Sequence, residues 1–371
     1  MMKKIVSIIV VAALLCGVNV TSINAAGTYY KGDINGDGVI DTIDLVYMQQ
    51  FLNGSIYADG ETAERLDLNR DYIINEYDKA LLSPIVMGIN STCYMNHYCT
   101  SALPSQENRQ YKKYTISTAS ETTYTLNSLN NIPNRVIIGD DDRIPESGLK
   151  GVVKISNQNG FGTGFVVDDH TILTVAHNIY DRSNYSFKSS IACEIYVNNT
   201  PLAYPINITE LHVPVSYISS SDYDALCKYD YAIIKVSNNL RSFINFDLGI
   251  LRNDVNNFSK DIYVTGFGGG SDTTFHPINI NLQNVKSTGI GNLLPSTLGV
   301  WNNSIYHDVD IVSGDSGGPI YTVNPDGSKT VIGIQNLEHF TVQNNTPEDP
   351  LYNSGIRITT DILHFVYNNF N

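Results

Sequence analysis

Short apolar runs separated by glycine, asparagine and aspartate fill residues 136–371. Runs of this length, bounded by turn residues, predict an antiparallel β fold. Residues 162–177 have the pattern of a strand, a turn and a second strand, and residues 229–236 that of a further apolar strand. Residues 361–367 follow helical spacing and predict an amphipathic helix. This region is therefore expected to be mainly β, with a C-terminal helix.

The N-terminal part has a different pattern. Leu45, Met48 and Leu52 recur at helical spacing, and Gly54 is expected to end that helix. The chain opens on two lysines, an apolar run and small residues, which is typical of a secretory signal and too short to span a bilayer. Residues 91–135 are rich in Ser, Thr, Asn and Tyr and lack apolar periodicity, so they predict a linker or propeptide. The expected division is a signal peptide over 1–26, a small module over 27–90, a linker or propeptide over 91–135 and a β domain over 136–371.

Composition narrows the class of protein. With 371 residues and 42% apolar content, the chain can build more than one core. The net charge of −14 without a basic cluster excludes nucleic acid and an anionic membrane surface as partners. No later segment is apolar enough to span a membrane, so the protein is expected to be secreted and extracellular. Export permits disulfides, and Cys93 with Cys99 or Cys193 with Cys227 are candidates whose pairing the sequence leaves open.

A candidate nucleophile lies in residues 310–319, which read Asp-Ile-Val-Ser-Gly-Asp-Ser-Gly-Gly-Pro. A serine hydroxyl needs a base and donors for the oxyanion that it creates. The backbone amides of Gly314 and Ser316 can supply those donors. Upstream, His177 ends a strand and Asp230 precedes another, at intervals of 53 residues (230−177) and 86 residues (316−230). The order His, Asp, Ser is that of chymotrypsin-like enzymes.

Three motifs carry a family resemblance: Thr-Val-Ala-His, Tyr-Asp-Tyr-Ala-Ile-Ile and Gly-Asp-Ser-Gly-Gly-Pro. With these, the region from residue 136 resembles the trypsin/chymotrypsin superfamily, and residues 136–143 resemble its bacterial glutamyl-endopeptidase branch. The resemblance implies a double antiparallel β-barrel and a serine endopeptidase acting on proteins or peptides without a catalytic cofactor. It makes Ser316 the nucleophile, His177 the base and Asp230 the residue that orients the imidazole. A catalytically silent protease fold used as a binding module is the alternative.

The resemblance also assigns activation and specificity residues. Cleavage after Arg135 would free the α-amine of Val136 to pair with Asp315 and order the oxyanion hole, so an Arg135→Gln precursor is expected to be inactive. Asp310, six residues before the serine, occupies the position of a pocket carboxylate that selects Arg or Lys. Gln335 stands where glutamyl endopeptidases carry a histidine. A basic P1 residue is favoured over glutamate, and whether activation releases the N-terminal module stays open.

Two acidic loops in the N-terminal module have the pattern of calcium-binding EF-hand loops. The first would bind Ca²⁺ through the side chains of Asp33, Asn35, Asp37, Asp41 and Asp44 and the carbonyl of Val39. The second begins 34 residues later (67−33) and offers Asp67, Asn69, Asp71, Asn75 and Asp78 with the carbonyl of Ile73. It has Tyr72 where glycine normally supplies a positive φ, and Pro84 is expected to cut the following helix short.

This duplicated loop-helix pattern resembles a type I dockerin, which uses calcium to fold and binds a cohesin module of a scaffold protein. The resemblance places the cohesin contacts at Thr42-Ile43 and Glu76-Tyr77. Because those pairs differ, symmetric binding in two orientations is not expected. The predicted architecture is thus a small α-helical, dockerin-like module attached to a secreted protease of a cellulosome-type assembly.

Overall fold

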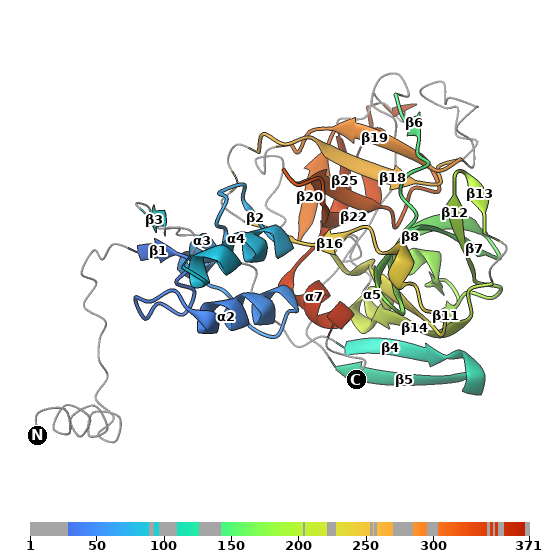
Figure 1. Ribbon diagram of the computed structural model, residues 1–371. Coiled ribbons are helices and arrows are strands. Elements are labelled where there is room, and N and C mark those ends of the chain that lie inside the picture. Colours follow the sequence, from blue (N-terminus) through green and yellow to red (C-terminus); the bar gives the residue numbers. More distant parts are fainter. Residues whose placement is uncertain are drawn as a thin grey trace, which may run out of the picture.

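The chain folds into a small helical part and a larger part built from two β-sheets, as Figure 1 shows for this computed structural model. The structure describes residues 29–88, 93–95, 110–125, 142–202, 205–220, 228–252, 255, 258–269, 285–294, 303–339, 342–343, 346–347 and 352–367. Among these residues, no helix combines the length and the apolar character needed to cross a membrane.

Three helices form the N-terminal part: α2 (Thr42–Leu52), α3 (Gly60–Leu66) and α4 (Glu76–Val86). Asp41 caps α2 and Asn75 caps α4, and in both helices the aspartate at the third position bonds back to the backbone of the capping residue. These reciprocal bonds satisfy amides that the start of a helix leaves without partners. As predicted, α2 ends before Gly54, whose φ is +71°. The prediction for Pro84 is wrong, because α4 continues two residues past it; in a last turn, proline disrupts little remaining helix.

The first β-sheet has nine strands in the order β13-β12-β7-β8-β9-β15-β14-β4-β5. Its strands are β4 (Gln110–Thr115), β5 (Ser120–Thr125), β7 (Val152–Asn157), β8 (Gly160–Asp168), β9 (Thr171–Thr174), β12 (Ala192–Val197), β13 (Thr200–Pro201), β14 (Ile208–Pro214) and β15 (Ala232–Val236). The hairpin β4–β5 comes from the segment expected to be a linker or propeptide, and it pairs antiparallel with β14. Tyr111 of this hairpin is fully buried and stacks on Phe365 with ring centroids 4.1 Å apart. Part of the predicted linker is therefore an integral edge of the sheet.

The second sheet has eight strands, seven of them in the order β20-β25-β22-β21-β18-β19-β6. Its strands are β6 (Ile144–Pro145), β16 (Asp247–Leu248), β18 (Ile262–Gly266), β19 (Ser287–Gly291), β20 (Ser304–His307), β21 (Pro319–Val323), β22 (Lys329–His339) and β25 (Tyr352–Arg357). The eighth strand, β16, pairs parallel with β22. The other seven strands of this sheet pair antiparallel with one another, as the short apolar runs and turns predict.

Shorter elements complete the described chain. Four two-stranded pairs are β1 (Tyr29–Lys31) with β3 (Cys93–Met95), β10 (Tyr180–Asp181) with β11 (Ser186–Phe187), β2 (Ile73–Ile74) with β17 (Ile250–Leu251), and β23 (Val342–Gln343) with β24 (Thr346–Pro347). The helical pieces are α5 (Val215–Ser219), α7 (Thr360–Tyr367) and the 3-10 turns η1 (Ile116–Thr118), η2 (Ala176–Asn178) and η3 (Arg241–Phe243). The predicted C-terminal helix is thus confirmed as α7.

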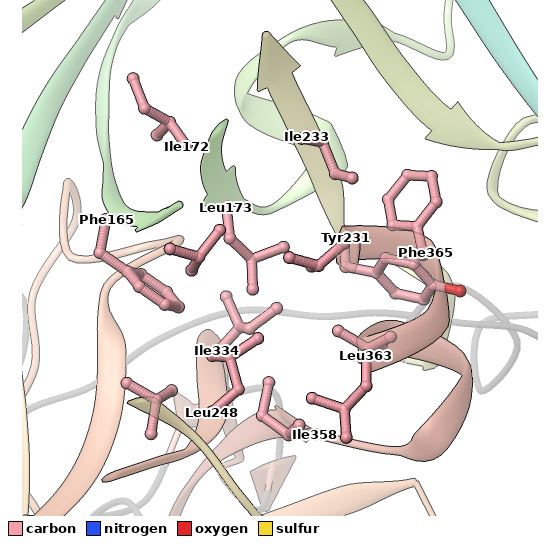
Figure 2. Close-up of a cluster of buried hydrophobic side chains, with 14 of the residues drawn as sticks. Phe165, Ile172, Leu173, Tyr231, Ile233, Leu248, Ile334, Ile358, Leu363 and Phe365 are labelled. Atoms are coloured by element: carbon pink, nitrogen blue, oxygen red, sulfur yellow. The ribbon is translucent and has the colours of Figure 1, made fainter. Parts of the chain in front are cut away.

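A continuous apolar core joins the two sheets to α7 (Figure 2). Phe165 and Leu173 of the first sheet face Ile334 of the second, and all three side chains are fully buried. Leu363 and Phe365 extend this core from α7. Packing from both sides fixes the distance between the sheets, and the loops that carry the candidate catalytic residues meet between them.

Candidate active site

The three residues predicted as a catalytic triad form one hydrogen-bonded chain. His177 lies in η2 after β9, Asp230 lies two residues before the start of β15, and Ser316 lies in the turn before β21. His177 Nε2 is 2.8 Å from Ser316 Oγ, and His177 Nδ1 is 2.6 Å from Asp230 Oδ2. Both distances are those of hydrogen bonds. The fold therefore brings together residues that are far apart in the sequence.

The environment of Asp230 sets the orientation of the imidazole. Asp230 is completely buried, and its second carboxylate oxygen accepts the backbone N–H of His177 at 2.8 Å. The Ala176 amide also donates to the backbone carbonyl of Asp230 at 2.9 Å. A carboxylate facing Nδ1 favours the tautomer with the proton on Nδ1, which leaves Nε2 as an acceptor for the Ser316 hydroxyl. The His177 side chain is 31% exposed, so a substrate can reach it.

The turn around the serine requires glycine at the position two residues before the nucleophile. Gly314 has a φ of +107°, and an added Cβ would lie 2.6 Å from both Phe161 Cε2 and the Phe267 carbonyl oxygen. Only glycine fits there without strain. Thr163 holds the turn by donating its hydroxyl to the Gly314 carbonyl at 2.7 Å. Within the described residues, the amides of Gly314 and Ser316 donate to no other group, so both are available to a developing oxyanion.

Asn178 supports this turn, although its role could not be deduced from the sequence. It directly follows His177 in the sequence. Its Nδ2 donates to the Ser316 carbonyl at 2.9 Å, the Thr163 carbonyl at 3.1 Å and the Thr174 hydroxyl at 3.0 Å. A buried amide thus links the nucleophile turn to the first sheet.

Asp315, predicted to receive a freed α-amine, is paired with a side chain of the intact chain. Arg143 Nη1 lies 3.3 Å from Asp315 Oδ2, and the two side chains are only 2% and 3% exposed. The same carboxylate oxygen accepts the Val312 amide at 2.8 Å. An added Cβ on Gly268 would lie 2.3 Å from Arg143 Nη1 and 2.8 Å from Asp315 Oδ2, so this pair requires a glycine beside it. The guanidinium is carried into the site by the residues preceding β6, which pairs with β19.

The two residues predicted to set specificity are both buried. Asp310 is 4% exposed, and its carboxylate accepts the Asp142 amide at 3.1 Å. Gln335 is completely buried, with Oε1 2.7 Å from His307 Nε2 and Nε2 donating to the Ser354 carbonyl at 3.0 Å. The Val309 amide donates to His307 Nδ1 at 3.2 Å, which assigns the ring proton to Nε2. Gln335 is therefore held by its neighbours rather than turned freely toward a substrate.

The first calcium loop has the internal hydrogen bonds of an EF-hand loop. Asp33 accepts the amides of Asp37 and Gly38 at 3.1 Å each, and Asp44 accepts the Ile34 amide at 2.7 Å. The side chain of Asp44 is fully buried, and burial raises its pKa. A buried carboxylate beside other acidic oxygens favours a cation that offsets the desolvation. The donor chemistry of this loop therefore fits Ca²⁺.

The second loop has the same bonding pattern in a more buried setting. Asp67 accepts the amides of Asp71 and Tyr72 at 3.2 Å, and Asp78 accepts the Leu68 amide at 2.8 Å. Tyr72 adopts a φ of +67°, the conformation that glycine usually supplies. Burial, followed by the charges of Asp67 and Asp71, raises the pKa of Asp78 well above its ordinary value. Among the described residues, the side chains of His, Cys, Asp and Glu form no group of three that could hold a metal ion by themselves. Both predicted calcium loops also use side-chain amide oxygens and a backbone carbonyl oxygen as ligands.

Some predicted residues lie outside the described part of the chain. These are Arg135 and Val136, and the partners Cys99 and Cys227 of the two possible disulfides. Cys193 is a buried thiol in the structure, and burial raises the pKa of this thiol to about 12.

Comparison with known proteins identifies both parts. The trypsin family model matches residues 137–352, and the model of the dockerin type I domain matches residues 31–86. The chain therefore belongs to the trypsin family of serine peptidases and carries a type I dockerin domain at its N-terminal side. The predicted fold class, a chymotrypsin-like β fold with a small helical dockerin module, is confirmed.

Two relatives belong to the glutamyl-endopeptidase branch. A glutamyl endopeptidase of Bacillus licheniformis is 27% identical over 116 residues, which are 30% of this chain and 35% of that protein. The match thus spans about a third of the relative's length. A solved structure of a Glu endopeptidase in complex with MPD is 22% identical, with a TM-score of 0.47 over 62% of this chain and 97% of that one.

Proposed function

We propose that this protein is an exported serine endopeptidase that hydrolyses peptide bonds through Ser316, His177 and Asp230. The observation that carries the proposal is the chain of hydrogen bonds of 2.6 Å and 2.8 Å linking a buried carboxylate, an imidazole and a serine hydroxyl. A turn with two amides available for an oxyanion lies beside that hydroxyl. A structural domain would need neither arrangement.

The proposed reaction has two stages. Ser316 Oγ bonds to the scissile carbonyl carbon as its proton moves to His177 Nε2, and the amides of Gly314 and Ser316 stabilise the negative carbonyl oxygen. The C–N bond then breaks, His177 returns the proton to the leaving amine, and an acyl-enzyme remains. Water then attacks the acyl carbon as its proton moves to His177 Nε2. The bond from that carbon to Ser316 Oγ breaks, His177 returns the proton to Oγ, and the acid product leaves. Asp230 stabilises the imidazolium in both stages.

We assign the ordering of the oxyanion turn to the buried pair of Arg143 with Asp315. Asp315 lies between the two residues whose amides form the hole, so its position fixes the direction of both N–H groups. We also propose cleavage after Arg135, which lies outside the described residues. Because Arg143 already supplies a cation, we expect the turn to be ordered whether or not that cleavage frees Val136.

For the substrate, we propose a basic residue at P1. Asp310 is a buried carboxylate next to the nucleophile loop, and an anion there favours a cationic side chain. Gln335 is a neutral amide held by His307 and Ser354, and it offers no positive charge for glutamate. The named specificity of the curated relative is glutamyl, so comparing Arg, Lys and Glu substrates decides between the two.

The dockerin domain is proposed to bind calcium through both loops and to attach the enzyme to a cohesin module of a scaffold, as in a cellulosome. Calcium would offset the negative charges of the acidic oxygens that lie close together in each loop. Export by the signal over residues 1–26, which lie outside the described residues, would place the protein outside the cell. A catalytically silent protease fold that acts only as a docked binding module is the second candidate.

A fluorophosphonate probe separates the two candidates. The probe forms a covalent adduct only with an activated serine, so intact mass is recorded for the secreted protein and for Ser316→Ala. A Ser316-dependent adduct supports the peptidase, and its absence from folded protein of every length refutes it. The mass of the labelled species also shows whether the active form begins at Val136 or still contains the dockerin.

A further inference from the structure

The second calcium loop of the dockerin is joined to the protease domain by backbone hydrogen bonds. Strand β2 of this loop pairs antiparallel with β17 of the protease domain, with Ile74 opposite Ile250 and Ile73 opposite Leu251. The amide of Arg252 extends the pairing by donating to the Tyr72 carbonyl at 2.7 Å. Two segments nearly two hundred residues apart thus form one small sheet.

Apolar packing strengthens this junction. Ile73 is completely buried and belongs to the apolar cluster of the second sheet, together with Leu251 and Ile262. Val39, at the equivalent position of the first loop, is 56% exposed. An added Cβ on Gly249 would lie 2.4 Å from Thr330 Cγ2 and 3.0 Å from Ile73 Cγ2, so the close approach requires glycine. The seventh residue of the second loop is therefore packed against the protease domain, whereas that of the first loop is open to solvent.

Protease cations meet the acidic groups of the second loop. Arg252 Nη1 lies 2.9 Å from Asp67 Oδ2 and 2.5 Å from Glu64 Oε2, and its side chain is 5% exposed. Lys260 Nζ lies 2.5 Å from Asp71 Oδ2. Asp67 and Asp71 occupy positions 1 and 5 of the calcium loop. Removing one partner of such a pair weakens the association of the two surfaces, because the other charge stays buried without its counter-charge.

Two further contacts widen the junction. The fully buried Asn75 donates its side-chain amide to the Thr330 hydroxyl at 2.9 Å. At the end of α2, an added Cβ on Gly54 would lie 2.3 Å from the His364 backbone nitrogen, so α2 rests directly on α7. Figure 1 shows α2 and α7 side by side. The dockerin is thus held at two separate places on the protease domain.

We infer that the second calcium loop is an intramolecular docking site, which keeps the dockerin bound to the protease domain when the chain connecting them is cut. The surface that receives it is formed by β17, Lys260 and Thr330, with Arg252 as the central cation. The inference concerns association alone and does not depend on whether Ser316 is active. It would allow proteolytic processing between the domains without loss of the scaffold attachment.

The test uses the full mature chain carrying Ser316→Ala, so that no self-digestion occurs. A recognition sequence for a specific viral protease is inserted between residues 96 and 109, and an affinity tag is placed at the N-terminal end. After complete cleavage in calcium buffer, the two pieces are separated by size exclusion and by capture on the tag. Hydrogen exchange of the peptide containing Ile250 to Arg252 is followed before and after the cut.

Variants test the assigned contacts. Arg252→Gln with Lys260→Gln removes both docking cations, and Lys150→Gln with Arg241→Gln removes the same charge from exposed positions of the protease domain. Capture of the protease piece is expected to be complete in the parent and in the control pair. In the docking pair, dissociation is expected to be at least about tenfold faster. If the docking pair misfolds, as lost protection of β9 and β15 would show, Lys260→Gln alone is measured, since this side chain is 23% exposed.

The outcomes are distinct. Pieces that separate at once in the parent, with protection of Ile250 to Arg252 lost, overturn the inference. Equal retention of the docking and control variants would show that these cations do not hold the dockerin, which overturns the assigned site. Retention in the parent and control, with faster dissociation in the docking variants, supports it.

Discussion

Replacing Arg143 with alanine is expected to impair catalysis more than it impairs folding. The residue directly precedes β6, and its buried guanidinium faces the carboxylate of Asp315 at 3.3 Å. Removing it takes the cation away from a carboxylate whose side chain is only 3% exposed. Asp315 must then move or take up a proton, and either change displaces the neighbouring amides of Gly314 and Ser316.

The size of the effect follows from the burial of the pair. Because both side chains are at most 3% exposed, solvent screening is small, and breaking such a pair costs roughly 3–5 kcal/mol. At about 1.4 kcal/mol for each factor of ten, this corresponds to a loss of about 10²- to 4 × 10³-fold in rate if the whole cost falls on the turn in its active conformation. Removal of one oxyanion donor has an effect of about the same size. The loss should appear mainly in kcat, because the oxyanion exists only in the transition state.

The assay measures steady-state peptide hydrolysis and the rate of fluorophosphonate labelling of Ser316, with thermal unfolding recorded in parallel. Arg143→Lys keeps the charge and should restore activity to within about tenfold. Arg241→Ala, whose side chain is 80% exposed and 3.7 Å from Asp169, is the matched control and should be unchanged.

Two results would refute the reasoning. One is an Arg143→Ala protein that stays folded and keeps its kcat within threefold of the parent. The other is an inactive but folded Arg135→Gln protein whose activity returns once Val136 is freed, because the α-amine would then be the cation that Asp315 needs.

The remaining predictions concern support of the site, pH, calcium and docking. Asn178→Ala should lower the unfolding free energy by about 1–3 kcal/mol and slow turnover, because the Ser316 carbonyl loses a buried donor; urea unfolding with no shift in midpoint would contradict this. Burial lowers the pKa of His212 to about 4, against the opposing effect of its bond to Glu210. The unfolded chain therefore binds the extra proton first, stability should fall as pH drops from about 6.5 to 4, and His212→Gln should flatten that fall in acid-unfolding curves. Chelation of calcium should reduce helical circular dichroism of the dockerin while near-ultraviolet signals of the β domain persist; simultaneous loss of both would show that the domains unfold together. Ile43, which is 48% exposed, should contribute more to capture by a type I cohesin than the half-buried Tyr77, so Ile43→Ala should weaken binding more than Tyr77→Ala.

Local residue patterns in the sequence were sufficient to predict the chemistry of the site. A nucleophile turn needs glycines next to the serine, and a calcium loop needs oxygen donors at fixed spacing, so both are visible in short stretches of sequence. The order of His177, Asp230 and Ser316 and the alternation of short apolar runs then indicated the β fold. Each motif and each apolar run depends on neighbours within a few residues, which is why they could be predicted.

Contacts between distant segments were decided only by the tertiary structure. Arg143 and Asp315 are 172 residues apart, and Arg252 and Asp67 are 185 apart, so no local pattern marks either pair. The hairpin of β4 and β5 is polar on its own, and it is a strand pair because β14 offers it an open edge and Phe365 covers Tyr111. Asp315 and Asp67 lie in motifs that the sequence shows, but Arg143 and Arg252, their partners, carry no local signal for these pairings. The role of each arginine comes from the burial and the charge of a partner that the fold brings to it.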